Sequence, residues 1–422
     1  MSQVAAQPSR LLSGHTVSLR AGAGNALSLG LLVVGAICLL ITFAVPLTAG
    51  GDAEKPLAAI AMVGYLVGFS VVTGIALGCL AFTMILHQVN AGWSALVRRQ
   101  VENVMSMLFP LCIALFIPLL ISIFVKPGLV WSWMNADYVA GDLIYDWKKG
   151  FLNVPFFLGR SVLYFAIWSW LAYSLYSFSR KQDSTADRWL TARARRISSF
   201  GLLLFAFSTS FASFDWLMSL DFHWFSTMFG VYFFAGNFGA ALSTVILILL
   251  ALRKFAGLDN LITTEHLHDM GKLLFGFVVF WAYIGFSQYF LIWYANIPEE
   301  TSWYILRREG GWRYLAVALA AGRFCFPFVM LMPRPWRRSP LVLAFISVWL
   351  IGCQIIDIYW VARPTVHDAG HHSVFFHPID IVAVLGPICI FVGMLIRRIA
   401  SGPLVPTNDP RLAESLHHKN SV

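Results

Sequence analysis

Two aspartates and a histidine lie within SFASFDWLMSLDFHW (residues 210–224), a short segment between two long apolar runs. A carboxylate among aromatic rings is suited to proton transfer if burial raises its pKa, or to a fixed ion pair if an arginine lies close. Asp215, Asp221 and His223 are therefore candidates for chemistry at the edge of a membrane. Asp215 most needs a proton or a partner, because the pattern places it at a helix C-terminus, where a negative charge opposes the helix dipole.

The composition defines the class of protein that must position these groups. Of 422 residues, 58% are hydrophobic and 12% are charged, whereas soluble domains average about 25% charged residues. Several apolar stretches exceed the roughly 20 residues that cross a bilayer as a helix. The sequence therefore predicts an all-α polytopic membrane protein. Its net charge of +9 comes from basic residues in short loops, so we expect no binding to nucleic acid.

Ten transmembrane helices are predicted. Their approximate ranges are 25–46, 57–89, 100–125, 153–179, 196–217, 222–252, 266–297, 306–331, 340–362 and 377–399. Helices 2–5 and 6–9 form two sets of four with the same orientation, which is compatible with a parallel duplication. Prolines are expected to kink the helices that contain them: Pro110, Pro118, Pro327 and Pro387.

The distribution of lysine and arginine predicts the orientation. One set of loops and helix ends carries 19 of these residues and the opposite set carries seven. By the positive-inside rule, the N-terminal segment (1–24), the basic loop (180–195) and the tail (401–422) are cytoplasmic. The Trp-rich segment 126–152 is then an outer loop, and the chain is expected to lie within the lipid bilayer.

Further polar residues are predicted on the outer side. Asp357 lies inside the ninth helix, where a charge is costly, and a simple ion pair with an arginine such as Arg313 is the plainer interpretation. Asp380, like Asp221, fits a carboxylate that caps the start of a helix. Arg160 lies about two turns into the fourth helix from the outer side.

A second polar cluster is predicted on the inner side, in TTEHLHDMGK (263–272). His268, Asp269 and Lys272 share one helix face because they are spaced by three or four residues. Tyr283 and Ser287 continue this face outward as a polar stripe. The stripe is suited to a chain of waters, although a snorkelling lysine above ordinary packing tyrosines explains it equally well. The same leaflet is expected to hold three further polar residues: His87, Glu102 and Arg323.

The sequence offers no catalytic residue, metal site or soluble cofactor motif. All six cysteines fall inside predicted helices without CxxC spacing, which is typical of small buried hydrophobic residues. A membrane anchor for b-type haem, with His87 and His268 as ligands, is a further alternative. Histidines in membrane spans more often form hydrogen bonds within the bundle.

Three segments resemble a known family. They are SFDWLMSLDFHWFSTMFGVYFFAG (213–236), HDMGKLLFGFVVFWAYIGFSQYFLIWYANIPEET (268–301) and HQVNAGWSALVRRQVENV (87–104). They resemble the NrfD-like (polysulfide-reductase membrane subunit) family, and within it the second NrfD-like subunit of bacterial alternative complex III, a quinol:cytochrome c or high-potential-protein oxidoreductase.

The resemblance implies two four-helix bundles (helices 2–5 and 6–9) flanked by helices 1 and 10. It implies several partners: a second NrfD-like membrane subunit, a periplasmic iron–sulfur protein, c-type cytochrome subunits and small membrane subunits. The haem c groups and iron–sulfur clusters would then be on partners and none on this chain, whereas a quinone is a candidate ligand. In such a complex this subunit serves as scaffold and proton path beside the quinol-oxidising subunit.

Two other functions compete with that interpretation. One is quinone binding by this chain, at Arg160, Asp215 and His223. The other is a proton-coupled secondary transporter, for which buried acids are also suited. Within the first interpretation, we hypothesise a proton path whose outer end is Asp215 with Asp221 and His223. Its inner end would be Asp269 and Lys272, and the Tyr283–Ser287 stripe would join the two depths.

Overall fold

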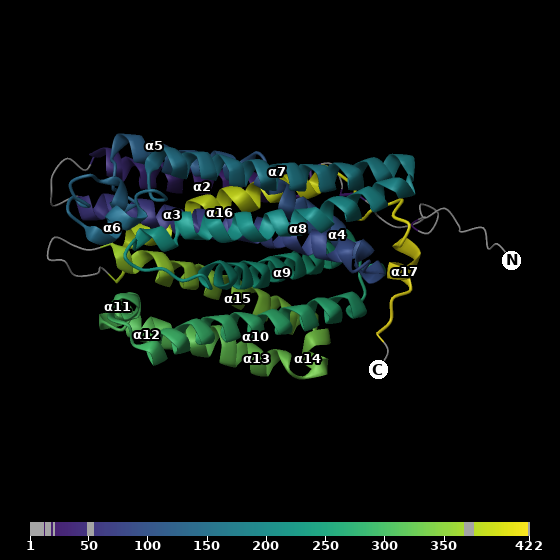
Figure 1. Ribbon diagram of the computed structural model, residues 1–422. Helices are drawn as coiled ribbons and strands as arrows, with labels where there is room; N and C mark the ends of the chain where they lie inside the picture. The colour runs from purple at the N-terminus through teal and green to yellow at the C-terminus, as the bar shows by residue number, and fades with distance from the viewer. Residues whose placement is uncertain (1–11, 13–17, 20–21, 49–54, 367–374, 421–422) are drawn as a thin grey trace.

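The computed structural model describes residues 12, 18–19, 22–48, 55–366 and 375–420, and these residues form helices and turns without any strand. Ten helical segments are long and apolar enough to cross a membrane. Figure 1 shows them as a stack of nearly parallel rods. The prediction of an all-α polytopic membrane protein is confirmed.

The bounds of these helices agree closely with the sequence prediction in most cases. The continuous helices are α2 (Asn25–Thr48), α3 (Lys55–Gln88), α7 (Val154–Thr185), α8 (Arg188–Trp216), α9 (Phe229–Ala256), α10 (Thr264–Ala295), α15 (Pro340–Ala362) and α16 (Pro378–Ala400). The third crossing consists of α4 (Ala95–Met105) and α5 (Leu111–Val125), and the eighth consists of α12 (Gly310–Leu319), a π-helical turn (Ala320–Cys325) and α13 (Phe326–Leu331).

Helix α3 is the centre of the fold, since 94% of its most apolar window is buried. It packs against α4, α5 and α8, which with α7 form the first bundle, and against α9 and α15 of the second bundle. Small residues allow this close approach. A Cβ atom on Gly68 would lie 2.6 Å from the backbone oxygen of Val384, and one on Gly78 would lie 2.7 Å from the Ala241 side chain. Helix α16 fills the remaining side of α3 and pairs with α2.

The second bundle is formed by α9, α10, α12–α13 and α15. In Figure 1 it lies below the first bundle, with α9 and α15 nearest to the rest of the molecule and α10, α12 and α13 on its far side. Short helices lie between crossings: α6 (Leu143–Lys148), α11 (Pro298–Leu306) and α14 (Arg334–Arg338). The two sets of four helices thus occupy separate halves of the structure.

Two predicted boundaries are wrong. The sixth helix begins at Phe229 and not near residue 222, so Asp221 and His223 lie in the preceding turn segment and do not open a helix. The segment 180–195, predicted as a loop, is almost entirely helical, because α7 continues to Thr185 and α8 begins at Arg188. Ala186 makes the turn between them with a left-handed φ of 52°.

The C-terminal segment also differs from the polar tail that the sequence predicts. Residues 401–420 run across one end of the bundle and include α17 (Leu412–Leu416), which Figure 1 shows near α4. Leu404, Val405 and Leu412 are fully buried. Most of the predicted N-terminal segment 1–24 lies outside the described residues.

Candidate functional site

Helices α7 and α8 join Arg160 to Asp215 in a bidentate ion pair. Arg160 Nε donates to Asp215 Oδ2 at 2.8 Å and Nη2 donates to Oδ1 at 2.6 Å. The Tyr164 hydroxyl, one turn further along α7, donates to the same Oδ2 at 2.7 Å. Both carboxylate oxygens are therefore occupied, and Arg160 is the partner that Asp215 needs at its helix C-terminus.

The surroundings of this pair exclude water. Asp215 is 0% exposed and Arg160 is 7% exposed. The rings of Phe151 and Phe156 lie 3.8 Å and 4.2 Å from the guanidinium carbon, a cation–π arrangement. The two charges stabilise each other in this site, because removing either residue leaves the other buried without a partner.

The Trp-rich segment 126–152 covers the outer end of the first bundle. Its Trp131 is buried and donates from Nε1 to the Trp216 carbonyl at 3.2 Å. Lys148 donates to the Phe222 carbonyl at 2.6 Å. The segment therefore folds onto this chain, although Trp147 is 89% exposed and remains accessible on its outer side.

His223 does not join Asp215 but pairs with this covering segment. Its Nε2 lies 2.7 Å from Asp142 Oδ2. The backbone N–H of Tyr145, and after it the hydrogen bond and charge of His223, lower the pKa of the Asp142 carboxyl. Asp221 accepts the backbone N–H of His223 at 3.3 Å, so it stabilises a turn and does not cap α9, contrary to the prediction.

A second buried pair forms in the second bundle. Asp357 on α15 accepts from Arg323 Nη1 at 2.6 Å and from the Tyr232 hydroxyl of α9. The expected partner, Arg313, is exposed and contacts the Tyr314 hydroxyl instead. The sequence predicts Arg323 in the inner leaflet. In the structure it lies midway along its crossing, in the π-helical turn, and its long side chain reaches Asp357.

This second pair belongs to a longer hydrogen-bonded chain. Arg323 Nη2 donates to Gln354 Oε1, and Gln354 Nε2 donates to Asn237 Oδ1 at 2.9 Å. All four members, from Asp357 to Asn237, are at least 95% buried. The polar groups therefore continue from the carboxylate into the interior of the second bundle.

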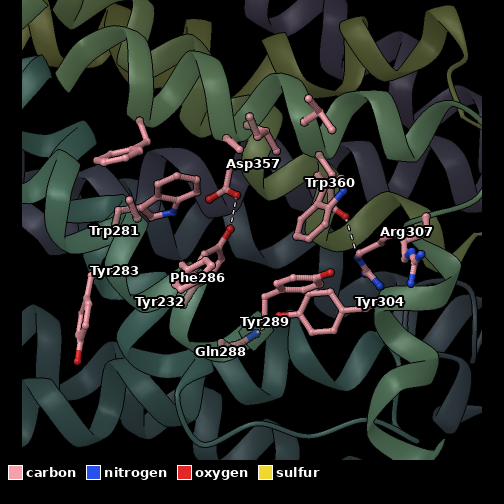
Figure 2. Close-up of a pocket in the computed structure, with 18 of the residues that line it drawn as sticks. Tyr232, Trp281, Tyr283, Phe286, Gln288, Tyr289, Tyr304, Arg307, Asp357 and Trp360 are labelled. Atoms are coloured by element: carbon pink, nitrogen blue, oxygen red, sulfur yellow. Dashed lines mark hydrogen bonds between the residues drawn. The ribbon is translucent and has the colours of Figure 1, made fainter. Parts of the chain in front are cut away.

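A pocket of about 700 Å³ opens beside Asp357. Figure 2 shows Asp357 bonded to Tyr232 on one side, with Trp281, Tyr289 and Tyr304 among the aromatic side chains around the space. In the first bundle, the Arg160–Asp215 pair lies beneath aromatic side chains. The pocket beside Asp357 therefore distinguishes the second pair from the first.

Arg307 lies at the same pocket and is only 1% exposed. Its guanidinium donates to the carbonyls of Trp303, Trp360 and Val361, and the bond to Trp360 is visible in Figure 2. Burial lowers the pKa of Arg307 to about 9, against the opposing charge of Asp221. Arg307 therefore stays protonated at neutral pH.

The two buried pairs occupy equivalent places. In each set of four helices, the arginine is on the third helix and the aspartate is toward the outer end of the fourth. A tyrosine hydroxyl donates to each carboxylate, but Tyr164 lies on the third helix of its set and Tyr232 on the first. This correspondence agrees with the parallel duplication that the order of the helices allows.

Asp380 is placed as predicted, in the first turn of α16. It accepts the backbone N–H of His377 at 2.9 Å and forms a capping box with it. It also pairs with Arg363 Nε at 3.0 Å and accepts from Tyr359 at 3.0 Å. Its contacts explain it as a helix cap and an ion pair that joins α16 to the end of α15.

The inner cluster is assembled as the helix spacing predicts, with one addition. Lys272 Nζ lies 2.5 Å from Asp269 Oδ1. The C-terminal segment adds His418, whose Nε2 lies 2.5 Å from Asp269 Oδ2, and Asn420, which accepts from Lys272 at 2.9 Å. His268 is buried, and its Nδ1 has no hydrogen-bond partner in the described part of the chain.

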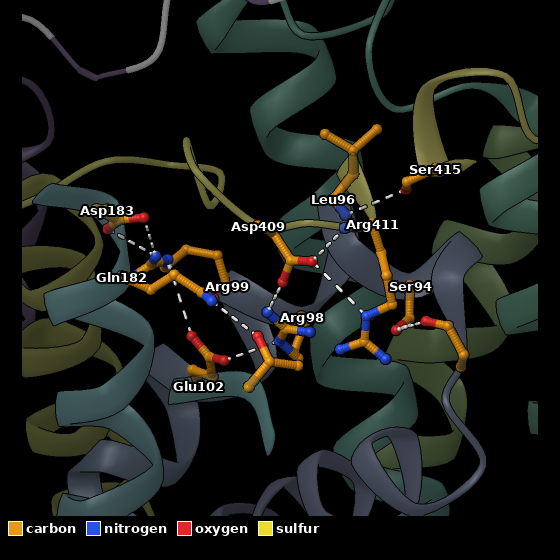
Figure 3. Close-up of polar contacts among 12 residues, drawn as sticks. Ser94, Leu96, Arg98, Arg99, Glu102, Gln182, Asp183, Asp409, Arg411 and Ser415 are labelled. Carbon is orange, nitrogen blue, oxygen red and sulfur yellow. Dashed lines mark hydrogen bonds and ion pairs between the residues drawn. The ribbon is translucent and has the colours of Figure 1, made fainter. Parts of the chain in front are cut away.

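A charged network that the sequence did not reveal anchors the C-terminal segment. Arg98 pairs with Glu102 at 3.0 Å and with Asp409, as Figure 3 shows. Arg99 pairs with Asp183 of α7 at 2.7 Å. All of these side chains except Asp183 are essentially inaccessible. Glu102 and Arg98 are one turn apart, which was a detectable signal, but nothing in the local pattern indicated that a distant tail residue completes the network.

The predicted polar stripe faces away from the bundle. Tyr283 is 64% exposed, and Ser287 is half-buried. On a crossing helix this face meets lipid or a neighbouring subunit, so this chain does not enclose the Tyr283–Ser287 stripe by itself.

No group of three or more His, Cys, Asp or Glu residues suited to a metal ion occurs in the described ranges. All six cysteines are free. Cys325 is exposed on the membrane-facing side of the eighth crossing, contrary to the expectation that every cysteine is buried. The other five are buried or half-buried.

The fold and these pairs define a polytopic α-helical membrane protein with buried arginine–aspartate pairs in both halves. Comparison of the sequence with protein-family models and with curated proteins gives no match.

Proposed function

We propose that this chain is an integral membrane subunit of a quinol:cytochrome c (or other high-potential acceptor) oxidoreductase of the alternative complex III type. It acts as scaffold and proton path beside the quinol-oxidising NrfD-like subunit, in a bacterial inner membrane with both termini in the cytoplasm. The observation that carries the proposal is the succession of buried polar groups through the second bundle.

The outer part of this path is the hydrogen-bonded chain that begins at Asp357 and passes through Arg323 and Gln354 to Asn237. Asp357 is suited to the outer end because it lines the open pocket. The inner end is Asp269 with Lys272.

Buried polar atoms without hydrogen-bond partners occur on three helices of the second bundle, α9, α15 and α10. The Asn237 Nδ2, the Ser347 hydroxyl and the His268 Nδ1 have no hydrogen-bond partner among the described residues. Buried polar atoms of this kind are commonly satisfied by internal water. Water at these three atoms would extend the chain toward Asp269 and provide a route for protons inside the bundle.

This route differs from one that begins at Asp215. Asp215 lies beneath the covering segment with Arg160 and Tyr164 on its oxygens, and it does not line the pocket that Asp357 lines, which favours a structural role for that pair. Quinone binding at Arg160, Asp215 and His223 has less support for the same reason, and because His223 pairs with Asp142. The outer groups Asp221 and His223 then belong to the cover over the first bundle.

The test is proton translocation by the assembled complex in vesicles, with the variants Asp357→Asn and Lys272→Met. We expect Lys272→Met to give assembled complex and near-normal quinol oxidation with reduced proton translocation. Asp357→Asn also removes the ion-pair partner of Arg323, so its reduced translocation is measured per electron at equal amounts of assembled complex. Asp146→Asn is the matched control, because Asp146 is 55% exposed and pairs only with Lys149. Unchanged translocation in both variants would contradict the path, and loss of quinol oxidation with translocation per electron unchanged would favour a quinone-binding role.

The scaffold part of the proposal requires surfaces for partners. The outer cover presents Tyr138, Leu143 and Trp147 to water, with exposed fractions of 62%, 75% and 89%. Aromatic residues of this kind dominate protein interfaces, so we propose that they contact the periplasmic iron–sulfur and c-type cytochrome subunits. Trp147→Ala with Leu143→Ser should release those subunits on purification, whereas Trp189→Ala, at an exposed cytoplasmic position, should not. A complex that stays whole in the first variant would place docking elsewhere.

A further inference from the structure

Three arginines gather at the outer mouth of the pocket in the second bundle. Arg307, Arg308 and Arg313 all line it, and none forms an ion pair with a carboxylate in the described parts of the chain. The acids on the same stretch do not line the pocket: Glu299, Glu300 and Glu309. Because Asp221 lies near Arg307, the unbalanced positive charge at the mouth comes from Arg308 and Arg313.

The walls of the pocket are apolar and reach the membrane-facing surface. Helix α10 contributes Tyr283 and Phe286, and α12 contributes Val317, each 64–65% exposed. The opposite wall is aromatic, with Trp303 and Trp360. The volume of about 700 Å³ falls within the range of roughly 300–1,000 Å³ that is typical of small-molecule sites.

We propose that this pocket binds one anionic phospholipid of the outer leaflet. Its phosphate lies against Arg308 and Arg313 with Arg307 behind them, and an acyl chain enters between α10 and α12. The apolar walls are suited to a lipid chain, and Arg308 and Arg313 select a negative headgroup. Asp357 at the inner side does not oppose the anion, because Arg323 neutralises its charge.

Charge selectivity is tested with the full chain purified in mild detergent, by native mass spectrometry after titration with phosphatidylglycerol or phosphatidylcholine. We expect one phosphatidylglycerol retained preferentially. Since each arginine at an anionic lipid surface is worth roughly a factor of five, Arg308→Gln with Arg313→Gln should weaken its binding about thirtyfold. The control Arg195→Gln with Arg334→Gln removes the same charge from exposed cytoplasmic positions and should have no effect.

Occupancy of the pocket itself is tested with Ala316→Phe. Ala316 lines the pocket, whereas Ala318 on the same helix is exposed and does not. Ala316→Phe should abolish retention, and Ala318→Phe should leave it unchanged. Equal retention of both lipids, competition by inorganic phosphate alone, displacement by a short-chain quinone, or insensitivity to both sets of variants would each overturn the proposal.

Discussion

Separation of Arg160 from Asp215 is the perturbation whose effect follows most directly from the contacts. Asp215→Asn removes the charge that Arg160 faces and leaves the guanidinium with the Phe151 carbonyl at 3.0 Å and two aromatic rings. Breaking a buried ion pair by removing one partner costs about 3–5 kcal/mol. Because the pair joins α7 to α8, that loss should appear in the stability of the first bundle.

The measurement is a double-mutant cycle by thermal unfolding of the purified chain in detergent. With an unfolding entropy of about 2.1 cal/mol/K per residue over 422 residues, a loss of 3–5 kcal/mol lowers Tm by about 3–6 °C. Arg160→Met should cost about as much as Asp215→Asn. The combination Arg160→Met with Asp215→Leu should recover most of the loss, since it leaves no unpaired charge.

The exposed pair Lys149–Asp146 serves as the control. Its side chains are 64% and 55% exposed, and exposed pairs contribute at most about 1 kcal/mol. Asp146→Asn should therefore change Tm by about 1 °C or less. The reasoning is refuted if Asp215→Asn behaves like this control, or if the double variant is no more stable than either single one.

Three further predictions concern the end of the bundle that carries the C-terminal segment. Burial raises the pKa of Asp409, but the charges of Arg98 and Arg411 outweigh it and lower the value to about 2. Because the folded pKa is depressed, docking of the C-terminal segment should persist above about pH 4 and weaken as the pH falls toward 2, measured by hydrogen exchange of residues 404–416. Asp409→Asn should release that segment at neutral pH by removing the ion pair that joins it to Arg98, which limited proteolysis would detect; an unchanged cleavage pattern would contradict this. A cysteine in place of Ser184, an exposed residue, should react with an impermeant thiol reagent only after cells are opened, and labelling of intact spheroplasts would reverse the orientation.

The fold was largely predictable because its main determinants are local. Length and hydropathy along each crossing are sufficient to predict ten helices, and the capping residues His377 and Asp380 give the start of α16 correctly. The start of α9 was wrong because Phe222, Trp224 and Phe225 continue the apolar pattern through a segment that folds as turns. Hydropathy does not distinguish aromatic residues packed in a turn from those on a helix.

The site was predictable only in part because its pairings depend on depth and on distant segments. Arg160 and Asp215 are 55 residues apart, and the sequence indicated only that they share a leaflet. Arg313 was predicted as the partner of Asp357, whereas the observed partner is Arg323. The prediction failed because the π-helical turn and the length of the arginine side chain shift the depth at which the charge lies. The contacts of His418 and Asn420 with Asp269 and Lys272 could not be predicted, since the tail has no periodicity that fixes its path.

The buried arginine–aspartate pairs of the two halves differ in how accessible they are. Each half places an arginine on its third helix, an aspartate on its fourth and a tyrosine hydroxyl on the carboxylate. In the first half, segment 126–152 and its buried Trp131 cover the pair, so its contribution is cohesion. In the second half, residues of α10, α11 and α12 line a pocket at the pair. The chemistry of the paired groups is the same, so under the proposed proton path it is access to the carboxylate that makes Asp357, and not Asp215, suited to exchange protons with its surroundings.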